Sequence, residues 1–376
     1  MKYYLIAGER SGDLHGGNLI KAIKEQDAEA TFRYWGGDEM QAASGVAPVT
    51  HYKETAFMGV VEVLANLRTI QGFLKKCKKD VMDYQPDVLI LIDYAGFNLK
   101  IAEFAKKKGL KVFYYISPKV WAWNTKRAWK LKKYVDRMFC IMPFEENFYA
   151  KFDWKVDYVG NPVVDAVLNH QVNTDFRSKN NLSPDEDIIA LLPGSRKMEL
   201  TNMLPTFAEV VKKYPKHQFV VAAVANLDRQ LYAPIADLPN VKLVTGQTYD
   251  LYANAKAALV TSGTATLETA LWKVPQVVCY RINAISYHIM KFAIKISSTI
   301  KYIALMNLIL DKMAIKELIQ DEMTVENITA ELDQLLDENS DRRQEIMADY
   351  QRNIELLGTE SASERAANKM WGYLNQ

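Results

Sequence analysis

The sequence predicts an α/β protein made of two halves, each a parallel sheet with helices around it. Short apolar runs of strand length alternate with longer stretches of helical period, which is typical of βαβ units. The alternation weakens through a polar stretch near the middle of the chain and then restarts, so two Rossmann-like domains joined by a linker are expected. A chain of 376 residues is long enough for two hydrophobic cores.

The first half contains a series of strand candidates with helical segments between them. One helical segment, Leu99–Lys108, ends in lysines and is followed by Gly109, a typical C-terminal stop. The other helical candidates include Leu14–Glu25 and Gly59–Asp83. The strand candidates are Tyr3–Ala7, Thr31–Trp35, Val88–Ile92, Lys111–Ile116, Met138–Ile141 and Val156–Val159.

The polar stretch Asn169–Asp185 is rich in Asn, Ser and Asp and contains Pro184, which is typical of an interdomain linker. We therefore expect a first domain over 1–165, a linker over 166–186 and a second domain over 187–355. Open α/β sheets bind ligands beyond the carboxyl ends of their strands, so a cleft between the two domains is the expected site. The strand candidates of the second half are Asp187–Leu192, Gln218–Val224, Val241–Thr245, Ala257–Val260 and Gln276–Tyr280.

Composition and charge exclude several classes of protein. Hydrophobic residues make up 49% of the chain and charged residues 24%, so a disordered, collagen-like or coiled-coil protein is excluded. A formal net charge of +2 provides no chain-wide field for nucleic acid. The 3 cysteines and 5 histidines show no metal-ligand spacing, so we expect no metal site and a reducing, cytoplasmic compartment. No apolar run is long enough for an export signal or a membrane span.

Charge is unevenly distributed along the chain. The segment Phe104–Val135 contains ten bases and no acid, and three tryptophans interleave with them, a combination that favours the headgroup region of a membrane. The mostly apolar stretch Ile285–Ile303 carries lysines at helical spacing, which fits either a helix lying in an interface or an ordinary packed helix with snorkelling lysines. The residues expected at an anionic membrane surface are Trp121, Trp123, Lys126, Arg127, Trp129, Lys130, Lys291 and Lys295.

A glycine-containing turn, Gly8 to Asp13, follows the first strand candidate. Glycines there let the backbone approach a ligand, and the helix start favours an anion. The spacing does not fit a dinucleotide fingerprint, and two acids in the turn would repel a pyrophosphate. The turn is either structural, with Ser11 or Asp13 as a helix cap, or a polar floor for sugar hydroxyls. The candidate residues for contacts in the cleft are Glu9, Ser11, Gly12, Asp13 and Asn98.

An aspartate, Asp93, follows the strand candidate Val88–Ile92 directly. A carboxylate just past a buried parallel strand is partly desolvated, and its pKa can rise toward the range that is useful for a general base. The alternative is that Asp93 caps the following helix, and the same alternative applies to Asn98.

Two turns of the second half have the composition of anion sites. Gly194 and Ser195 open a helix beside Arg196, whose guanidinium can bind phosphate oxygens and stabilise departing charge. Ser262–Glu268 places hydroxyls and backbone N–H groups at another helix start, and Glu268 can accept hydrogen bonds from both hydroxyls of a ribose. Together they predict a diphosphate held by the second domain with its nucleoside alongside. The candidate residues are Ser195, Arg196, Ser262, Gly263, Thr264, Ala265 and Glu268.

These segments together resemble the lipid-A-disaccharide synthase family, glycosyltransferases with the two-Rossmann GT-B architecture. The similarity runs over essentially the whole chain. The segments that carry it are Gly8–Asp13, Met58–Leu64, Asp93–Asn98, Ser117–Trp123, Pro143–Glu145, Leu192–Arg196, Ser262–Glu268, Tyr280–Arg281 and Asn307–Leu308.

The resemblance implies transfer of 2,3-diacylglucosamine from its UDP derivative to the 6-hydroxyl of 2,3-diacylglucosamine 1-phosphate, with inversion, to form a β-1,6 disaccharide and UDP. Asp93 would be the general base, Arg196 a diphosphate ligand, Glu268 the ribose ligand, and Arg281 and Asn307 secondary donor contacts. The resemblance implies no metal or other cofactor, a peripheral position on the inner face of the inner membrane, and a C-terminal helix over 356–376 that crosses back to the first domain. A homodimer stays open.

The chain departs from the family pattern at a few positions. Asn161 stands where His is usual, Met306 precedes Asn307 where Pro is usual, and Tyr94-Ala95 replaces a turn that usually contains Pro. Two kinds of alternative function stay open. One is another GT-B enzyme acting on a UDP-amino sugar, such as a peptidoglycan-type transferase or a non-hydrolysing epimerase, and the other is a non-catalytic protein that binds nucleotide sugars and docks on membranes.

Overall fold

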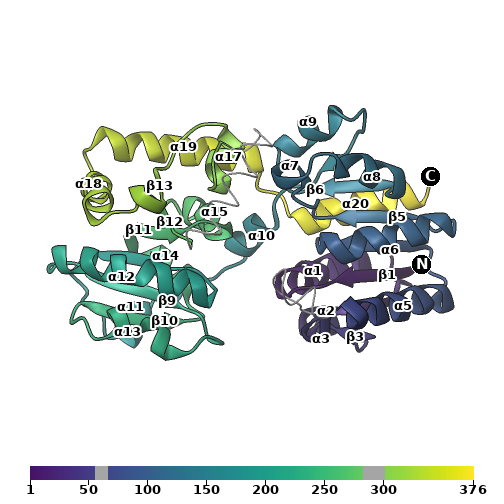
Figure 1. The fold of residues 1–376 in the computed structure, drawn as a ribbon, viewed down its shortest axis with the longest axis horizontal. Helices are drawn as coiled ribbons and strands as arrows, with labels where there is room; N and C mark the ends of the chain where they lie inside the picture. Colours follow the sequence, from purple (N-terminus) through teal and green to yellow (C-terminus); the bar gives the residue numbers. More distant parts are fainter. Residues whose placement is uncertain (56–66, 283–300) are drawn as a thin grey trace. The chain divides into compact units, whose positions relative to one another are not determined.

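The structure, a computed structural model, describes residues 1–55, 67–282 and 301–376 (Figure 1). The chain forms two compact units. Unit 1 consists of Met1–Pro162 with Glu360–Gln376, and unit 2 of Val163–Thr359. Each unit has a parallel sheet with its own hydrophobic cores, as the alternating sequence pattern predicts.

The sheet of unit 1 has the strand order β3-β2-β1-β4-β5-β6-β7, and every neighbouring pair is parallel. The order runs outward in both directions from the β1/β4 pair, so the topological switch point lies between these two strands. The strands are β1 (Lys2–Ala7), β2 (Thr31–Gly36), β3 (Thr50–His51), β4 (Val88–Ile92), β5 (Val112–Tyr115), β6 (Arg137–Cys140) and β7 (Asp157–Tyr158).

Helices of unit 1 cover the sheet and follow most of its strands, as right-handed βαβ connections require. The last of them, α20, comes from the end of the chain. They are α1 (Arg10–Gln26), α2 (Asp38–Ser44), α3 (Tyr52–Thr55), α5 (Leu67–Tyr84), α6 (Ala95–Lys107), α7 (Val120–Trp123), α8 (Arg127–Tyr134), α9 (Phe144–Ala150) and α20 (Ala362–Leu374).

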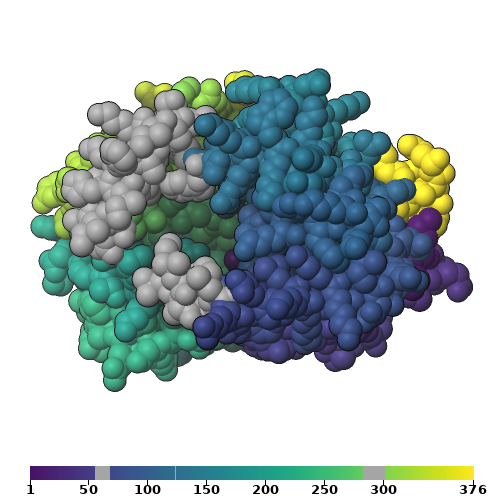
Figure 2. Space-filling view, turned by 45° about the vertical axis from the view of Figure 1, so that its right-hand side comes forward, coloured from purple at the N-terminus to yellow at the C-terminus, as the bar shows by residue number. Residues whose placement is uncertain are grey.

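The C-terminal helix α20 packs on α1 of unit 1. Ala366 and Met370 are buried in the same core as Leu19 and Ile23 of α1. Lys369 adds an ion pair of 2.8 Å to Asp157. The two ends of the chain therefore lie side by side on this unit, yellow beside purple in Figure 2.

The sheet of unit 2 has the strand order β10-β9-β8-β11-β12-β13, again parallel throughout. Its switch point lies between β8 and β11. The strands are β8 (Ile188–Leu192), β9 (Gln218–Ala223), β10 (Val241–Thr245), β11 (Ala255–Thr261), β12 (Gln276–Tyr280) and β13 (Glu317–Ile319). The helices are α10 (Pro162–Leu168), α11 (Phe176–Lys179), α12 (Lys197–Lys213), α13 (Ala233–Ala236), α14 (Thr248–Asn254), α15 (Thr264–Leu271), α17 (Leu305–Leu310), α18 (Val325–Leu336) and α19 (Asp341–Leu357).

The strand candidates of the sequence all form strands, with ends shifted by at most two residues. Two short edge strands, β3 and β13, were not expected, because runs of two and three residues carry no periodic signal. The expected linker over 166–186 is part of unit 2, since Phe176 and Leu182 are buried in the core that contains Ile188. The polar composition of this stretch gave no indication that Phe176 and Leu182 are buried.

Candidate functional site

The candidate residues of unit 1 lie at the switch point of its sheet. Ala7, the last residue of β1, pairs with Ile92, the last residue of β4, so the Gly8 turn and Asp93 are neighbours. Parallel sheets of this kind bind ligands at this point. The sequence placed both candidates after strands, and the strand order brings them together.

Three non-glycine residues at this end of the sheet have left-handed backbone conformations. Asp93 has φ 44°, Tyr94 φ 49°, and Ile116, directly after β5, φ 65°. Side chains rarely adopt this region, and a β-branched residue does so only under strain. Such strain persists where the surroundings enforce it, and it concentrates at functional sites.

Hydrogen bonds hold the backbone of Asp93 in this conformation. Its N–H donates to the carbonyl of Tyr115 (3.1 Å), and its own carbonyl accepts from the Tyr114 hydroxyl (2.5 Å) and the Asn98 side-chain amide (2.9 Å). Asn98 is fully buried and also donates toward the carbonyls of Ile6 and Ile92. Asn98 was expected to contact a ligand or to cap α6. It instead joins the ends of β1 and β4 and positions Asp93.

The environment of the Asp93 carboxylate raises its pKa. Burial is the largest cause, and the negative charge of Glu9 acts in the same direction. The Lys119 ammonium and the Tyr94 backbone N–H oppose this by stabilising the ionised form. A half-buried carboxylate with a raised pKa has the properties of a general base.

Tyr94 occupies the space above the Gly8 turn. A Cβ atom on Gly8 would lie 2.3 Å from the Tyr94 ring, so only glycine allows this approach. The ring stacks on Phe97 with centroids 5.4 Å apart, and its hydroxyl donates to the Thr55 carbonyl (3.2 Å). Gly8 therefore makes room for a side chain of the protein itself.

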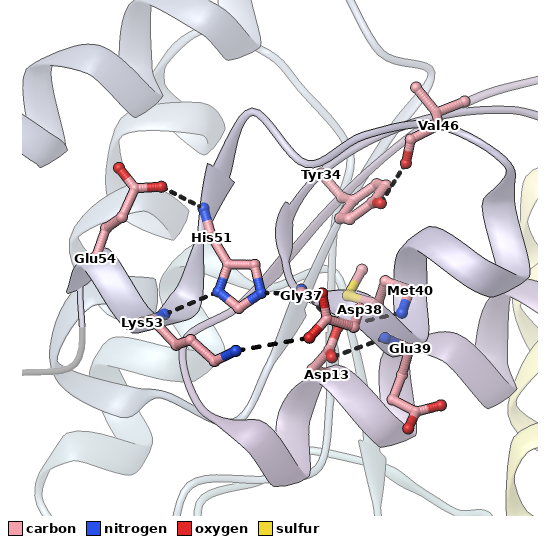
Figure 3. A network of polar contacts seen from close by, with 10 residues as sticks. All are labelled: Asp13, Tyr34, Gly37, Asp38, Glu39, Met40, Val46, His51, Lys53 and Glu54. Atoms are coloured by element: carbon pink, nitrogen blue, oxygen red, sulfur yellow. Dashed lines mark hydrogen bonds and ion pairs between the residues drawn. The ribbon is translucent and has the colours of Figure 1, made fainter.

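Asp13 has a structural role in this unit (Figure 3). Its buried carboxylate accepts backbone hydrogen bonds from Gly37 (2.6 Å), Glu39 (3.0 Å) and Met40 (3.2 Å) and so caps the start of α2. The expected contact with a sugar is corrected for this residue, because its oxygen atoms are already engaged. It does cap a helix, but a different helix from the one it belongs to.

The other candidates of the turn differ in accessibility. Gly12 is buried, and a Cβ atom there would lie 3.3 Å from that of Ala7, so this glycine allows α1 to approach β1 closely. Glu9 and Ser11 are exposed at the start of α1. Contacts of Glu9 and Ser11 with an acceptor sugar stay predictions.

A buried acid, Glu145, was not a candidate from the sequence. Its carboxylate accepts hydrogen bonds from the Trp121 indole (3.2 Å) and from the backbone N–H groups of Ile141 (3.2 Å) and Met142 (3.0 Å). Burial raises its pKa to about 7. The segment Pro143–Glu145 was part of the family resemblance, but nothing in the sequence pattern indicated that this acid holds Trp121 in place.

The residues expected at a membrane surface differ in their exposure to solvent. Trp121 is only 8% exposed, so the expectation of a surface position is wrong for this residue. Trp129 is 57% exposed, Lys126, Arg127 and Lys130 are also exposed, and Lys130 forms an ion pair with Glu103 (2.9 Å). The side chains of Trp123, Lys291 and Lys295 lie outside what the structure describes.

In unit 2, the first expected anion site is the turn after β8. Gly194 has φ 109°, and the N–H groups of Ser195 and Arg196 at the start of α12 donate to Glu199 Oε2 (2.7 and 3.1 Å). Arg196 also donates to Glu199 Oε1 (3.1 Å) while its side chain stays 66% exposed. Glu199, which the sequence did not single out, thus occupies the helix start as part of a capping box.

The second expected anion site is the turn after β11, which is adjacent because Leu192 of β8 pairs with Val260 of β11. Gly263 has φ 135° and precedes α15, and Gly263 and Thr264 are exposed, with Ala265 partly buried. Ser262 donates its hydroxyl to the Ile303 carbonyl (3.1 Å).

Glu268 lies one turn into α15. It is partly buried, and its Oε1 atom accepts a hydrogen bond from the Tyr249 hydroxyl (3.0 Å). Burial raises the pKa of Glu268, and the hydrogen bond from Tyr249 opposes this rise. The turns Gly194–Arg196 and Ser262–Glu268 are neighbours at the switch point of this sheet, and a donor site there stays a prediction.

The secondary donor candidates, Arg281 and Asn307, are engaged inside unit 2. Arg281 donates to Thr206 Oγ1 (3.2 Å) and to the carbonyls of Gln320 and Met323. Asn307 is fully buried. Its side-chain amide donates to the Ile315 carbonyl and to Glu317 Oε1, and its side-chain oxygen accepts from the Ile315 backbone N–H. Asn307 therefore fixes the chain around α17, and its expected direct contact with the donor is corrected.

Comparison with known proteins decides the family. The model of the lipid-A-disaccharide synthetase family matches residues 3–370. The lipid-A-disaccharide synthase of Geobacter metallireducens is 37% identical over 369 residues, 96% of this chain and 94% of that protein. The enzyme of Syntrophus aciditrophicus is 39% identical over 370 residues, 96% of this chain and 95% of that protein.

The chain belongs to the lipid-A-disaccharide synthase family. It is thereby a glycosyltransferase of lipid A biosynthesis. Among the described residues, no helix has the length and apolar character that crossing a membrane requires.

Solved structures confirm the GT-B fold class of this synthase. UDP-GlcNAc 2-epimerase from Neisseria meningitidis, solved bound to UDP-GlcNAc, has a TM-score of 0.70 at 15% identity, covering 99% of this chain and 100% of its own. The glycosyltransferase of kitacinnamycin has a TM-score of 0.61 at 15% identity and covers 98% of each chain. Likenesses at this identity show the fold alone.

The departures of this synthase from the family pattern have structural explanations at two positions. Asn161 is buried, and its amide donates to the Ile141 carbonyl (3.1 Å), so it fixes the chain beside β6. Tyr94, in place of a turn with proline, adopts the left-handed conformation and covers Gly8. Met306 is fully buried in the core of unit 2.

Proposed function

We propose that this synthase transfers 2,3-diacylglucosamine from its UDP derivative to the 6-hydroxyl of 2,3-diacylglucosamine 1-phosphate, with inversion at the anomeric carbon. The products are the β-1,6-linked disaccharide 1-phosphate and UDP. The observation that carries the proposal is Asp93, a carboxylate with a raised pKa held at the switch point of unit 1 by a strained and fully bonded backbone.

In the proposed reaction, the ionised Asp93 carboxylate takes the proton of the acceptor hydroxyl. The hydroxyl oxygen forms the new bond to the anomeric carbon while the bond from that carbon to the diphosphate oxygen breaks. One displacement inverts the anomeric configuration. A carboxylate whose pKa is raised accepts this proton more readily than an ordinary aspartate does.

The donor half of the proposal rests on unit 2. The exposed guanidinium of Arg196 and the N–H groups at the start of α15 are suited to the diphosphate, whose negative charge grows as UDP leaves. Glu268, with its Oε1 atom bonded to Tyr249, is suited to a ribose hydroxyl. The Neisseria meningitidis relative in fold, which was solved with UDP-GlcNAc, agrees with a UDP-sugar as the donor.

We also infer that the synthase binds the inner face of an anionic membrane, where substrates with acyl chains reside. Trp129 is exposed and lies on α8 together with basic residues. Its ring packs edge-on against Phe152, with ring centroids 5.4 Å apart. Each basic residue near such a surface contributes about 1 kcal/mol. The variant K126E/K130E should bind phosphatidylglycerol vesicles more weakly in a sedimentation assay, whereas K212E in unit 2 should bind like the wild type. Equal binding by all three would contradict the inference.

The direct test is incubation with UDP-2,3-diacylglucosamine, with and without the monosaccharide 1-phosphate, followed by mass spectrometry. The proposal predicts a disaccharide 1-phosphate and UDP only when both substrates are present. Conversion of the UDP-sugar to an isomer without acceptor would indicate the epimerase reaction of the structural relatives. Binding without any conversion would indicate a non-catalytic nucleotide-sugar-binding protein.

A further inference from the structure

An aromatic cluster of unit 2 lies next to Glu268. It consists of His170, Tyr249 and Trp272, whose ring centroids are 5.3 to 6.0 Å apart. The His170 ring meets the other two edge-on, at interplanar angles of 82° and 77°. Aromatic contacts of this kind hold the rings in defined orientations.

Tyr249 is the member of this cluster that contacts Glu268. Its hydroxyl donates to Glu268 Oε1 at 3.0 Å, and burial and the Glu268 charge raise the pKa of Tyr249. No hydrogen bond from the part of the chain that the structure describes reaches the other carboxylate oxygen, Oε2. One oxygen is therefore engaged, and the second is available to an incoming hydroxyl.

The position of Tyr249 is itself fixed by the segment before α11. His170 Nε2 lies 2.8 Å from Asp250 Oδ1, and the Asn173 backbone N–H donates to the same oxygen (2.9 Å). Asp250 is buried and directly follows Tyr249 on α14. These contacts hold α14 against the segment before α11, and the His170 ring packs edge-on against the Tyr249 ring.

We propose that Tyr249 is a positioning residue for donor binding, which orients the Glu268 carboxylate so that Oε2 accepts a hydroxyl of the donor's ribose. The inference rests on the proposed function, in which Glu268 binds the nucleoside. Tyr249 acts through Glu268 and does not touch the reacting atoms. A fixed carboxylate loses less conformational freedom when the donor binds, and this increases affinity.

The pH dependence of donor binding reports on this contact. Glu268 binds the donor in its ionised form, and the Tyr249 hydrogen bond lowers its pKa against the effect of burial. Removing the hydroxyl raises that pKa, so affinity is lost at a higher pH as the solution is acidified. The groups that face Glu268 from α14 are Tyr249 and Tyr252, with Asp250 and His170 beyond Tyr249.

The test is calorimetric titration of the full chain with UDP between pH 5 and 8, for the wild type, Y249F, E268Q and Y249F/E268Q. The matched control is Y214F, which removes an equivalent hydroxyl that donates to Asp333 (2.6 Å) elsewhere in unit 2. We expect Y249F to bind UDP roughly two- to tenfold more weakly, the cost of ordering one further side chain when the donor binds. The loss of UDP affinity on acidification should begin at a higher pH in Y249F than in the wild type. Y214F should match the wild type.

The double variant separates positioning from a general loss of structure. If Tyr249 acts through Glu268, Y249F/E268Q binds UDP no more weakly than E268Q alone. Additive losses would overturn the inference, as would wild-type affinity and an unchanged pH dependence of binding in Y249F. Absence of UDP binding by the wild type would instead overturn the proposed function, and the inference with it.

Discussion

The two units place their candidate sites at the same point of similar sheets but build them differently. In unit 1 the left-handed backbone positions at the switch point belong to Asp93 and Tyr94, whose side chains are large or charged. In unit 2 they belong to Gly194 and Gly263. In unit 1, strained backbone positions direct side chains toward the switch point, whereas in unit 2 glycines take the left-handed positions before the helix starts.

This difference matches two kinds of chemistry. A general base needs one carboxylate in a defined place with a raised pKa, and hydrogen bonds around Asp93 provide this. A diphosphate needs several donors around a diffuse negative charge, and the start of α15 beside Gly263 and the exposed guanidinium of Arg196 are suited to provide them. Changes in unit 1 should therefore affect turnover, and changes in unit 2 should affect donor binding.

The largest expected effect is that of D93N. The amide keeps the shape of the side chain but cannot take a proton, so kcat should fall by about 10²- to 10⁴-fold. UDP affinity, measured by calorimetry on the same preparation, should stay within twofold of the wild type, about 0.4 kcal/mol. A comparable loss of UDP affinity would show that the division between the two units is wrong.

The second effect concerns Asp13, which supports unit 1 without joining its chemistry. D13N weakens three backbone hydrogen bonds to a buried charged acceptor, and we expect unfolding free energy to fall by about 2 to 3 kcal/mol. Urea denaturation measures this loss. The activity per folded molecule should be retained, and a large fall in kcat for the folded fraction would return Asp13 to the acceptor site.

A third pair of variants compares the glycines of the two sites. G8A should cost about 1 to 3 kcal/mol through the clash with the Tyr94 ring, and trimming that ring in G8A/Y94A should restore part of this loss. G263A should cost about 1 to 2 kcal/mol because of its φ of 135°.

Trimming a neighbour offers no such rescue for G263A, since among the described residues nothing lies within 4 Å of a Cβ there. Thermal denaturation of the single and double variants distinguishes the two causes. If G8A is not rescued by Y94A, the Gly8 turn is constrained by its backbone like Gly263, and the contrast between the units fails.

The smallest effect is a shift in the acidic limb of the profile of kcat against pH. Asp93 must be ionised to act, and its pKa is raised, so activity is lost on acidification at a higher pH than for an ordinary aspartate. E9Q removes a charge that raises this pKa and should move the limb to lower pH. K119M removes a charge that lowers it and should move the limb to higher pH, each by less than about one unit. Shifts in the same direction would contradict the assignment of the limb to Asp93.

Much of the fold was predictable because parallel strands buried on both faces leave continuous apolar runs, such as Val88–Ile92 and Ile188–Leu192. The positions of Asp93 and Ser262 directly after strands, and of Gly194 two residues after one, were predictable for the same reason. The sequence did not predict which turns are neighbours within each sheet, the Gly8 turn with Asp93 in unit 1 and the Gly194 turn with the Ser262 turn in unit 2. Strand order is a property of long-range packing that local periodicity does not contain.

The roles of polar residues were harder to predict than their positions. Asp13 and Asn98 lie where they were expected, but their partners are backbone groups that are distant in sequence, such as Gly37 and Ile6. Glu199, Glu145 and Tyr249 were missed for the same reason, since a cap or a bonded hydroxyl is recognisable only once its partner is placed. Trp121 shows the converse, because composition alone suggested a surface position for a buried side chain.

The most direct measurement for the account as a whole is the anomeric configuration of the linkage that the wild-type synthase makes. A UDP-linked α-sugar attacked once by a hydroxyl that Asp93 deprotonates must give a β-linkage, which proton NMR recognises by a large coupling between H1 and H2 of the transferred glucosamine. The account predicts only this β-1,6 product. An α-linked product would mean net retention of configuration, which a single inverting displacement cannot give, and would contradict the assignment of Asp93 as the base for that displacement.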